Sequence, residues 1–411
     1  MLALRYADVF TTRPTAARVK VFSLLTILSL LPAFAAAELN PKNGNFLITY
    51  QDMVQQSSGR ELNLRRTFNS RSSTYSGWFG WGWNSPYETR LYVLPDGSVL
   101  VRESGAGLAH FYDPATGTKQ HEAGLEAIVA AARARNKLDA KQAGDLRAEL
   151  QKDEEKRAKA AAELGVGAAP PSGTKWVSRT CGSLERIADG WRRKMCLEDK
   201  YVDYFSPAGV LLRREDETGF TTLVWNGDRL DSVKDSSGLS LHYAWASDGR
   251  VVSVTGSSGA TVRYTYSPTG ELVLAEGKTV VGERMNFTYD SARRLTRMAY
   301  TDTTTDLVTY DDEGLTTAMV NRLGEKTLVE YGGSDTKYWT KVRRFSDAGN
   351  RVMERTYEFD VPPSATGEHT VERVVLREGE LQVTFERDGA VSAEPLRRRI
   401  EEAGPQRENA K

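Results

Sequence analysis

The sequence has 411 residues with 55 basic and 55 acidic side chains, so its formal net charge is zero. Binding to nucleic acid requires a basic face, which this balance does not supply, and we expect no nucleic-acid partner. The four histidines, His110, His121, His242 and His369, show no metal-ligand spacing, and the chain has no phosphate-binding loop. We therefore expect no metal, no cofactor and no enzymatic activity.

Residues 1–37 have the three parts of a secretory signal peptide in the usual order. Basic residues precede an apolar run over residues 21–31, and the small residues 33–37 follow it. The run is about half of the ~20 residues that a membrane-spanning helix needs, so we expect cleavage and not anchoring. Cleavage after Ala37 is predicted, with Ala35 as the alternative. The mature protein is then periplasmic or secreted, at the cell envelope, with no transmembrane anchor.

A predicted strand and a glycine–tryptophan segment follow. Residues 62–67 alternate apolar and polar side chains, which predicts a strand with one buried face. Glycines allow tight turns while tryptophans supply apolar area, so we expect the segment over residues 77–83 to plug or cap the start of a sheet. A sugar-stacking platform is the alternative. The residues concerned are Gly77, Trp78, Gly80, Trp81, Gly82 and Trp83.

Residues 40–112 resemble the small domain of unknown function that precedes the repeats in many Rhs and polymorphic-toxin proteins. Three motifs carry the resemblance. They are Gly44-Asn45, then Arg66-Thr67-Phe68-Asn69-Ser70, then Gly80-Trp81-Gly82-Trp83. The resemblance implies an N-terminal β domain, which we place at residues 38–120.

The composition changes abruptly at residue 121 to alanine, glutamate, lysine, arginine and leucine. Apolar residues recur at helical spacing near residue 125, and a second run over residues 138–164 has the same character. Residues 165–173, rich in glycine and proline, end it. We predict a helical hairpin and linker over residues 121–172, inserted between β segments. A solvated surface hairpin is one interpretation, and a docking arm for a protein partner or effector is the other.

The two cysteines, Cys181 and Cys196, are the only ones in the chain. Export to an oxidising compartment favours their pairing. The loop of about 15 residues that they would close is worth on the order of 3 kcal/mol in the chain-entropy model. Two free thiols, one of them nucleophilic, are the alternative, but no histidine lies near either cysteine in the sequence to activate it.

Residues 173–361 contain several copies of one sequence pattern. Each copy has an aromatic pair, then a turn ending in glycine, then a short run in which apolar and polar residues alternate. The clearest copies start at Tyr201, Tyr243, Tyr264, Phe287 and Val308. Tyrosines two residues apart share one face of a strand, so each unit is a two-stranded hairpin. Hairpins in series make one long antiparallel sheet, and its apolar face and exposed edge favour coiling over a flat sheet.

These units resemble the tyrosine–aspartate (YD) repeats of Rhs proteins. Tyr289-Asp290 and Tyr310-Asp311 keep the namesake dipeptide, and Asp248-Gly249-Arg250-Val251 keeps the turn. The resemblance implies a mainly β fold, a coiled antiparallel sheet of YD-repeat hairpins forming a partial Rhs-like shell, with the helical hairpin inserted. Residues 362–411 are expected to hold terminal strands and a charged tail.

The chain departs from that family in one respect. The Asp-Pro-x-Gly-Leu self-cleavage motif is missing, and the nearest string, Asp113-Pro114-Ala115-Thr116-Gly117, precedes the repeats. Residues 362–411 leave no room for a toxin domain. We therefore expect an exported non-enzymatic Rhs-like scaffold or binding protein, associated with a toxin or effector system.

Two alternatives to a scaffold stay open. A carbohydrate-binding surface adhesin would use exposed aromatic residues to stack on cell-surface carbohydrate, and the residues to inspect are Trp225, Trp245 and Trp339. A small toxin would carry its activity in the C-terminal tail after Val361.

Overall fold

The computed structural model describes residues 35–57, 59–104, 109–179, 181–195, 200–279, 282–364, 371–379, 381–386 and 397–401. Strands dominate these residues, and the fold is mainly β, as the sequence predicts. The predicted signal peptide lies outside the described residues, except for Ala35–Ala37 at the start of strand β1 (Ala35–Asn40).

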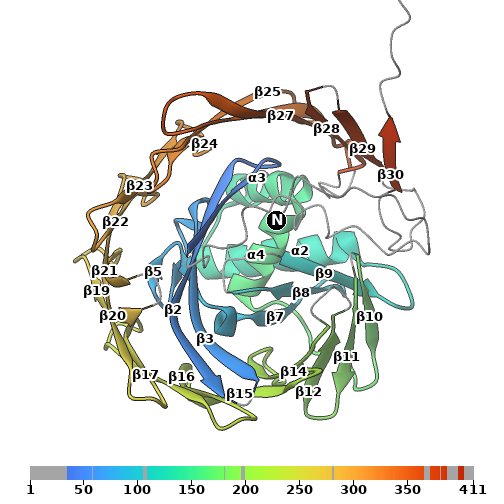
Figure 1. Ribbon diagram of the computed structural model, residues 1–411. Helices are drawn as coiled ribbons and strands as arrows, with labels where there is room; N and C mark the ends of the chain where they lie inside the picture. The colour runs from blue at the N-terminus through green and yellow to red at the C-terminus, as the bar shows by residue number, and fades with distance from the viewer. Residues whose placement is uncertain are drawn as a thin grey trace, which may run out of the picture.

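One long antiparallel sheet winds around the molecule as an open spiral (Figure 1). Its first strands lie near the centre, and its later strands form the outer turn. Each strand pairs with the strands before and after it in the chain, so the register follows from local hairpins. The strands are β7 (Arg90–Val93), β8 (Val99–Arg102), β9 (Ala109–Pro114), β10 (Lys175–Ser178), β11 (Ser183–Ile187), β12 (Gly190–Lys194), β13 (Val202–Phe205), β14 (Leu211–Asp216), β15 (Gly219–Asn226), β16 (Arg229–Asp235), β17 (Ser240–Trp245), β18 (Val251–Gly256), β19 (Thr261–Tyr266), β20 (Leu272–Thr279), β21 (Gly282–Tyr289), β22 (Leu295–Tyr300), β23 (Thr305–Tyr310), β24 (Thr316–Val320), β25 (Lys326–Gly333), β26 (Lys337–Phe345), β27 (Arg351–Asp360), β28 (Arg373–Glu378), β29 (Leu381–Glu386) and β30 (Arg397–Glu401).

The free edge of β7 is covered near the centre of the spiral. Arg90 forms a bridge with Val210, just before β14, and the Leu91 amide donates to the Gly209 carbonyl at 2.9 Å. Among the described residues, β7 is thus joined to the inner turn and not to β30. An edge strand that is paired in this way cannot add a strand from another chain.

Successive hairpins share one local device, a β-bulge at the aromatic residue that ends the first strand. A bulge increases the local twist, so a bulge at the same place in each hairpin coils the sheet. The bulged aromatic residue lies opposite the first residue of the returning strand, or opposite the second in the hairpin of Trp225, where Asn226 and Arg229 form one further pair. These pairs are Trp225 with Leu230, Trp245 with Val251, Tyr266 with Leu272, Tyr289 with Leu295, and Tyr310 with Thr316.

The same aromatic residues tie each hairpin to the one before it. Each donates a side-chain hydrogen bond to a main-chain carbonyl of the preceding hairpin, and we call this series the aromatic ladder. Its donor–acceptor pairs are Trp225 Nε1 to Leu211 O (3.0 Å), Trp245 Nε1 to Leu230 O (2.8 Å), Tyr266 Oη to Val251 O (2.6 Å), Tyr289 Oη to Leu272 O (2.7 Å), Tyr310 Oη to Leu295 O (2.9 Å) and Tyr331 Oη to Thr316 O (2.7 Å). Tyrosine and tryptophan serve here because each has an apolar body and a polar tip.

An aspartate and an arginine in the turn of the repeat each have a structural role. The Asp290 carboxylate accepts main-chain N–H bonds from Ala292 and Arg294, which fixes the turn. The Arg294 guanidinium then lies 5.0 Å from the ring centre of Tyr310 in the next hairpin. The Asp290 carboxylate therefore shapes the backbone of its turn.

A small N-terminal domain fills the inside of the spiral (Figure 1). Its long hairpin crosses the coil, and a short strand extends the same sheet. Its elements are β1, β2 (Asn45–Ser57), β3 (Arg60–Asn69), β4 (Ser76–Gly77), β5 (Gly80–Trp81), β6 (Trp83–Asn84) and the 3₁₀ turns η2 (Ser70–Ser72) and η3 (Pro86–Glu88). Most of the buried apolar side chains of this domain and of the coil form one continuous core.

An ion pair lies at the centre of that core. Arg66 Nε donates to Asp52 Oδ2 at 2.6 Å, and both side chains are fully buried. The hydroxyl of Tyr264, from the coil, donates to the same oxygen at 2.7 Å. The Arg66 guanidinium also lies 4.4 Å from the ring centre of Trp83 and 4.9 Å from that of Phe287. Charge, hydrogen bonds and stacking thus join the domain to the coil at one point.

The tryptophans of the glycine-rich segment pack against the inner face of the coil, which confirms the predicted plug. The ring of Trp78 packs edge to face on Trp225 and Trp245, with ring centres 5.8 and 5.4 Å away. Trp81 Nε1 donates to the Thr269 carbonyl at 2.8 Å. Trp83 Nε1 donates to the Tyr289 hydroxyl at 2.8 Å. Gly80, at φ +90°, lies so close to the carbonyl of Gly270 that a Cβ would be 2.6 Å from it.

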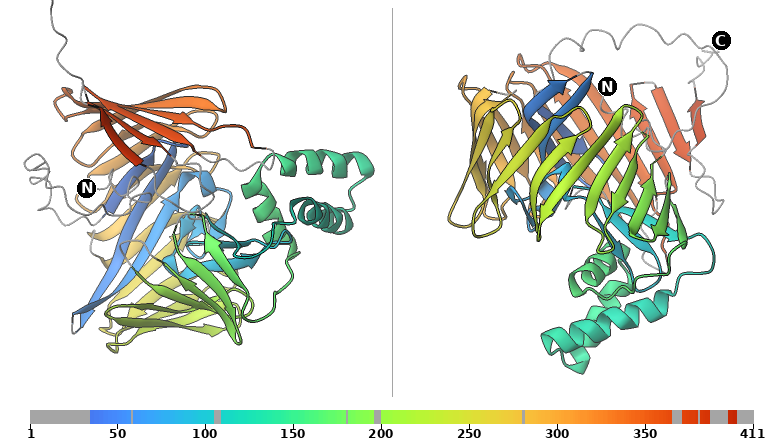
Figure 2. Two further views of the ribbon diagram at one scale, coloured as in Figure 1. Left: turned by 90° about the vertical axis from the view of Figure 1, so that its right-hand side faces the viewer. Right: turned by 90° about the horizontal axis from the view of Figure 1, so that it is seen from below.

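The inserted segment is helical, as predicted, but contains three helices and not the two of a hairpin. They are α2 (His121–Asn136), α3 (Ala140–Gln151) and α4 (Glu154–Leu164). The second predicted run breaks because Asp153 accepts a hydrogen bond from the Lys156 amide and so caps a new helix. Asp139 caps α3 in the same way through the Gln142 amide. Figure 2 shows the three helices projecting from one end of the coil.

Candidate functional site

The described residues show little that could perform chemistry. Within them, no three histidine, cysteine, aspartate or glutamate side chains gather in a way that could hold a metal ion. The helices placed by the structure include none long and apolar enough to cross a membrane. His369 and most of the charged tail, where the toxin alternative would lie, fall outside the described residues.

The largest buried charge cluster besides the central ion pair joins the first strands of the spiral. The fully buried Arg193 contacts Glu103 and Asp203, and Arg214 Nε donates to Asp203 at 2.7 Å. Burial opposes ionisation of Glu103, but the two guanidinium groups outweigh it and hold the pKa of Glu103 near about 2. Burial, aided by Arg193, lowers the pKa of the neighbouring His110 to about 4. Opposite charges satisfy one another here, so the cluster cross-links strands.

The three tryptophans proposed for carbohydrate stacking lie in different settings. Trp225 and Trp245 are part-buried on the inside of the coil, where Trp78 packs on both and their N–H groups serve the aromatic ladder. Trp339 is half-buried, and its indole covers Gly332 on the neighbouring strand. The structure does not bring the three together, and carbohydrate stacking by them stays a prediction.

The predicted disulfide cannot be placed in full. Cys181 lies just before β11, whereas Cys196 falls outside the described residues. The pairing of Cys181 with Cys196 therefore stays a prediction.

The three helices form a compact unit, which we call the arm (residues 121–164). The arm shares a second apolar core with the outer face of β8 and the turn before it. This core comprises Leu94, Leu100, Leu125, Ile128, Val129, Ala143, Leu150, Ala158 and Ala161. Because it is separate from the central core, the arm adds a second packed layer to the molecule.

Polar and steric contacts fix the arm on its mount. Arg179 binds Asp113 of β9 and Glu154 of α4 at 2.6 to 2.9 Å, and Lys119 binds the same two carboxylates at 3.3 Å. Gly124 of α2 lies so close to Asp96 that a Cβ would be 2.8 Å from the Asp96 amide nitrogen. The arm is therefore held in one orientation on the coil.

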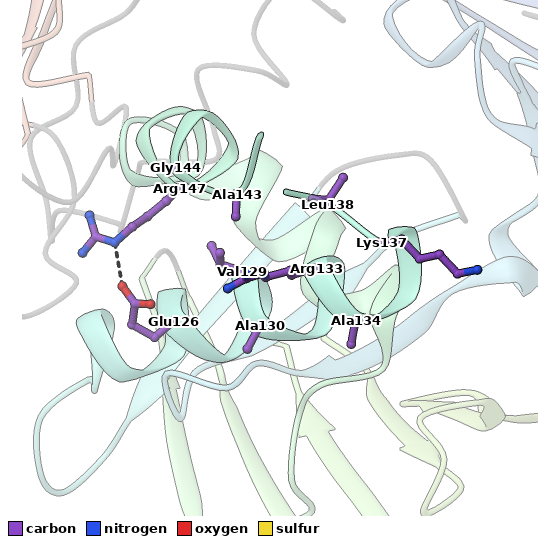
Figure 3. Close-up of a pocket in the computed structure, with 10 residues that line it drawn as sticks. All are labelled: Glu126, Val129, Ala130, Arg133, Ala134, Lys137, Leu138, Ala143, Gly144 and Arg147. Carbon is purple, nitrogen blue, oxygen red and sulfur yellow. Dashed lines mark hydrogen bonds and ion pairs between the residues drawn. The ribbon is translucent and has the colours of Figure 1, made fainter. Parts of the chain in front are cut away.

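A groove of about 700 Å³ lies on the outer side of the arm, between α2 and α3. In Figure 3, Val129 and Ala143 face one another across it, and Arg147 reaches over to Glu126. The other lining residues are Ala130, Arg133, Ala134, Lys137, Leu138 and Gly144. The lining is thus apolar in the middle and charged at its margins.

The charges of the groove are unevenly paired. Arg147 forms ion pairs with Glu122 and Glu126 of α2. Arg133 and Lys137 are exposed, and neither side chain forms an ion pair with another residue that the structure describes. The sequence analysis missed these two residues, although Arg133 follows Val129 at i+4 on the same helical face, and Lys137 is the C-cap residue that ends α2.

Comparisons with known proteins agree with part of the predicted resemblance. The family described as "Domain of unknown function (DUF6531)" matches residues 38–110, which comprise the domain inside the coil together with β7, β8 and the first residues of β9. The match covers less than half of the chain. No curated protein gives a significant match.

Solved structures of toxin complexes give partial matches. The Photorhabdus luminescens Tc holotoxin pore containing TccC3 is 9% identical, with 87% of this chain and 23% of that chain covered, at a TM-score of 0.24. The complex of TcdB2 and TccC3 is 10% identical, with 84% and 23% covered, at a TM-score of 0.22. The chain therefore spans under a quarter of these proteins, and scores this low establish neither a shared overall arrangement nor a function. In this chain the residues of the DUF6531 match lie inside and at the start of a coil of β-hairpins.

Proposed function

We propose that this protein is an exported, non-enzymatic scaffold of the bacterial cell envelope whose arm binds a protein of a toxin or effector system. The DUF6531 domain and the YD-like hairpins support a place in the Rhs/YD-repeat family. The turn contacts of Asp290 and Arg294 support it as well, because they give the Tyr-Asp and following Arg positions of the repeat a physical role.

The filled interior favours a scaffold over a container. The N-terminal hairpin, the tryptophan segment and the inner face of the coil share one apolar core, and the ion pair of Asp52 and Arg66 lies inside it. A passenger inside the part of the coil formed by β7 to β23 would have to displace this core. Binding therefore takes place on the outside of the molecule.

The groove on the arm is the observation that carries the proposal. Its apolar middle offers a place for small side chains, while Arg133 and Lys137 give its margin an uncompensated positive charge. Complementary charge steers association and selects partners. The partner that fits is a protein presenting an acidic segment with small apolar residues.

The test is a binding experiment with the mature chain, residues 38–411, as bait on a native envelope extract. A captured protein is purified, and its affinity is measured for the wild type, for Arg133→Glu with Lys137→Glu, and for the control Lys159→Glu on α4. We expect at least a tenfold loss of affinity for the double variant and little change for the control. Affinity should also fall with added salt, because exposed charges are screened.

Equal affinity of the double variant and the control for the captured protein would show that the arm is not its binding site. Killing of the expressing cell by the mature chain would instead favour the toxin alternative. N-terminal sequencing of the exported protein tests the signal peptide separately, with Glu38 as the expected first residue.

A further inference from the structure

A second recess lies where the N-terminal domain meets β7 and the turn between β17 and β18. Its volume is about 320 Å³, near the lower end of the range for small-molecule pockets. It lies outside the arm and includes Trp78 of the glycine–tryptophan segment, but none of Trp225, Trp245 and Trp339. Its lining residues are Tyr75, Ser76, Gly77, Trp78, Glu88, Arg90, Tyr92, Asp248, Gly249 and Arg250.

The lining combines aromatic rings with charged groups. Tyr75 is 37% exposed at the rim, while Trp78 and Tyr92 are half-buried. Trp78 is held in place by edge-to-face contacts with Tyr243 and Trp245, at 6.1 and 5.4 Å. Tyr75 therefore offers an exposed ring at the rim of a mostly polar recess, a mixture that can bind the apolar face and the hydroxyl groups of a sugar ring.

A buried carboxyl group lies in the recess. Glu88 is 6% exposed, and its two oxygens accept main-chain N–H bonds from Ser85 at 2.9 Å and from Trp78 at 3.2 Å. Gly77 is needed beside it, since a Cβ there would lie 3.0 Å from Glu88 Oε2. Burial, which outweighs these bonds, raises the pKa of Glu88 to about 8, so the group is protonated at neutral pH. It then offers an O–H donor to whatever occupies the recess.

The remaining charges leave the recess positive. Asp248 and Arg250 pair with each other. Arg90 is half-buried, and its side chain forms no ion pair with any residue that the structure describes. A guanidinium group without a partner is suited to a carboxylate, which it can bind through two parallel hydrogen bonds. With Glu88 neutral, Asp248 and Arg250 balancing each other and Arg90 without an ion pair among the described residues, the net charge of the recess is about one positive charge.

We infer that this recess binds one acidic saccharide unit, with Tyr75 against the sugar ring and Arg90 on its carboxylate. The buried Glu88 would donate to a ring hydroxyl. The inference does not depend on the arm, so the failure of one proposal leaves the other intact.

The experiment is a glycan array of matched saccharides that differ only in whether the terminal unit is glucose or glucuronate. Glucuronate binding is then titrated against the wild type, Tyr75→Ala, Arg90→Gln and the control Leu323→Ala, at an exposed residue in the turn between β24 and β25. We expect binding of the glucuronate member alone. Its affinity should fall at least tenfold in Tyr75→Ala and in Arg90→Gln and should not change in Leu323→Ala.

Three results would overturn the inference. These are no binding at millimolar saccharide, equal binding of the glucose and glucuronate members, or an affinity in Tyr75→Ala that is no lower than in the control Leu323→Ala. Near-ultraviolet circular dichroism of each variant shows whether its tertiary packing is kept. If Arg90→Gln disturbs the fold through its place next to the bridge with Val210, the exposed Tyr75→Ala still decides the outcome.

Discussion

Charged side chains occur both in the core of the coil and on the arm, and the two regions use them differently. In the core, Asp52 and Arg66 are fully buried and bonded to each other, to Tyr264 and to aromatic rings. On the arm, Arg133 and Lys137 are exposed and form no ion pair with a described residue. The difference indicates that charge in the core is structural, because leaving it unpaired would be costly, whereas charge on the arm is available for a partner.

The largest effect is expected from breaking the central ion pair. Asp52→Ala leaves the Arg66 guanidinium buried without its carboxylate and removes the acceptor of Tyr264, so we expect a loss of about 3–5 kcal/mol in the free energy of unfolding. Urea denaturation followed by tryptophan fluorescence measures this loss. The double variant Asp52→Ala with Arg66→Met should cost less than the two single changes added together. A loss below about 1 kcal/mol in Asp52→Ala would contradict a structural role for buried charge.

A pH-dependent effect is expected from Glu88. Burial raises the pKa of Glu88 to about 8 in the folded protein, against an ordinary value of 4.5. Its contribution to stability is therefore fully present below pH 4.5 and is lost as the pH rises through 8. Urea midpoints at pH 5 and pH 9 should differ more for the wild type than for Glu88→Gln. An equal difference in both proteins would mean that Glu88 is ionised throughout.

A smaller effect is expected from the aromatic ladder. Tyr289→Phe removes the donor to the Leu272 carbonyl and the acceptor of Trp83, so we expect a loss of about 2 kcal/mol. The control is Tyr204→Phe, whose hydroxyl bonds the part-exposed Glu215 and has no place in the ladder. Thermal or urea unfolding of the two variants compares them. Similar losses would show that the ladder adds nothing beyond an ordinary surface hydrogen bond.

The smallest effect is expected on the outer face of the coil. Thr265 is exposed and follows the buried Tyr264 on the same strand. Thr265→Ala should change the free energy of unfolding by no more than about 0.5 kcal/mol. Tyr264→Phe, one residue away, should cost several times as much because it removes the bond to Asp52. Urea unfolding of Thr265→Ala and Tyr264→Phe compares the contributions of an exposed and a buried side chain of one strand to the free energy of unfolding.

Much of the fold could be predicted from the sequence because the signals are local. The aromatic pairs and glycine turns predict the hairpins, and hairpins in series fix both the sheet and its register. The Tyr-Asp and Asp-Gly-Arg motifs gave the turns their expected chemistry, as Asp290 shows. The tryptophan plug was predicted as well, because glycine and tryptophan together are suited to a tightly packed cap.

Other features could not be predicted because they depend on contacts between distant residues. The break before α4 rests on the side chain of Asp153 in a stretch that otherwise favours one helix. Trp225 and Trp245 look like surface aromatics in the sequence, but the coil turns both toward Trp78. The recess beside Glu88 joins residues about 160 positions apart in the chain, and its only local signal is the Ser85-x-x-Glu88 capping box.

The aromatic ladder has a direction, and this direction bears on how the chain is built. Every rung donates backward, from a later hairpin to a carbonyl that an earlier hairpin has already placed. When a hairpin is synthesised, the carbonyl group that accepts its hydrogen bond is already in place in the preceding hairpin. Folding can therefore proceed hairpin by hairpin from the N-terminal end, in the order of synthesis. The same direction makes one hairpin the unit by which such a coil can be lengthened. Duplicating a whole hairpin adds one donor and one acceptor together, so every other hydrogen bond of the ladder keeps its partner.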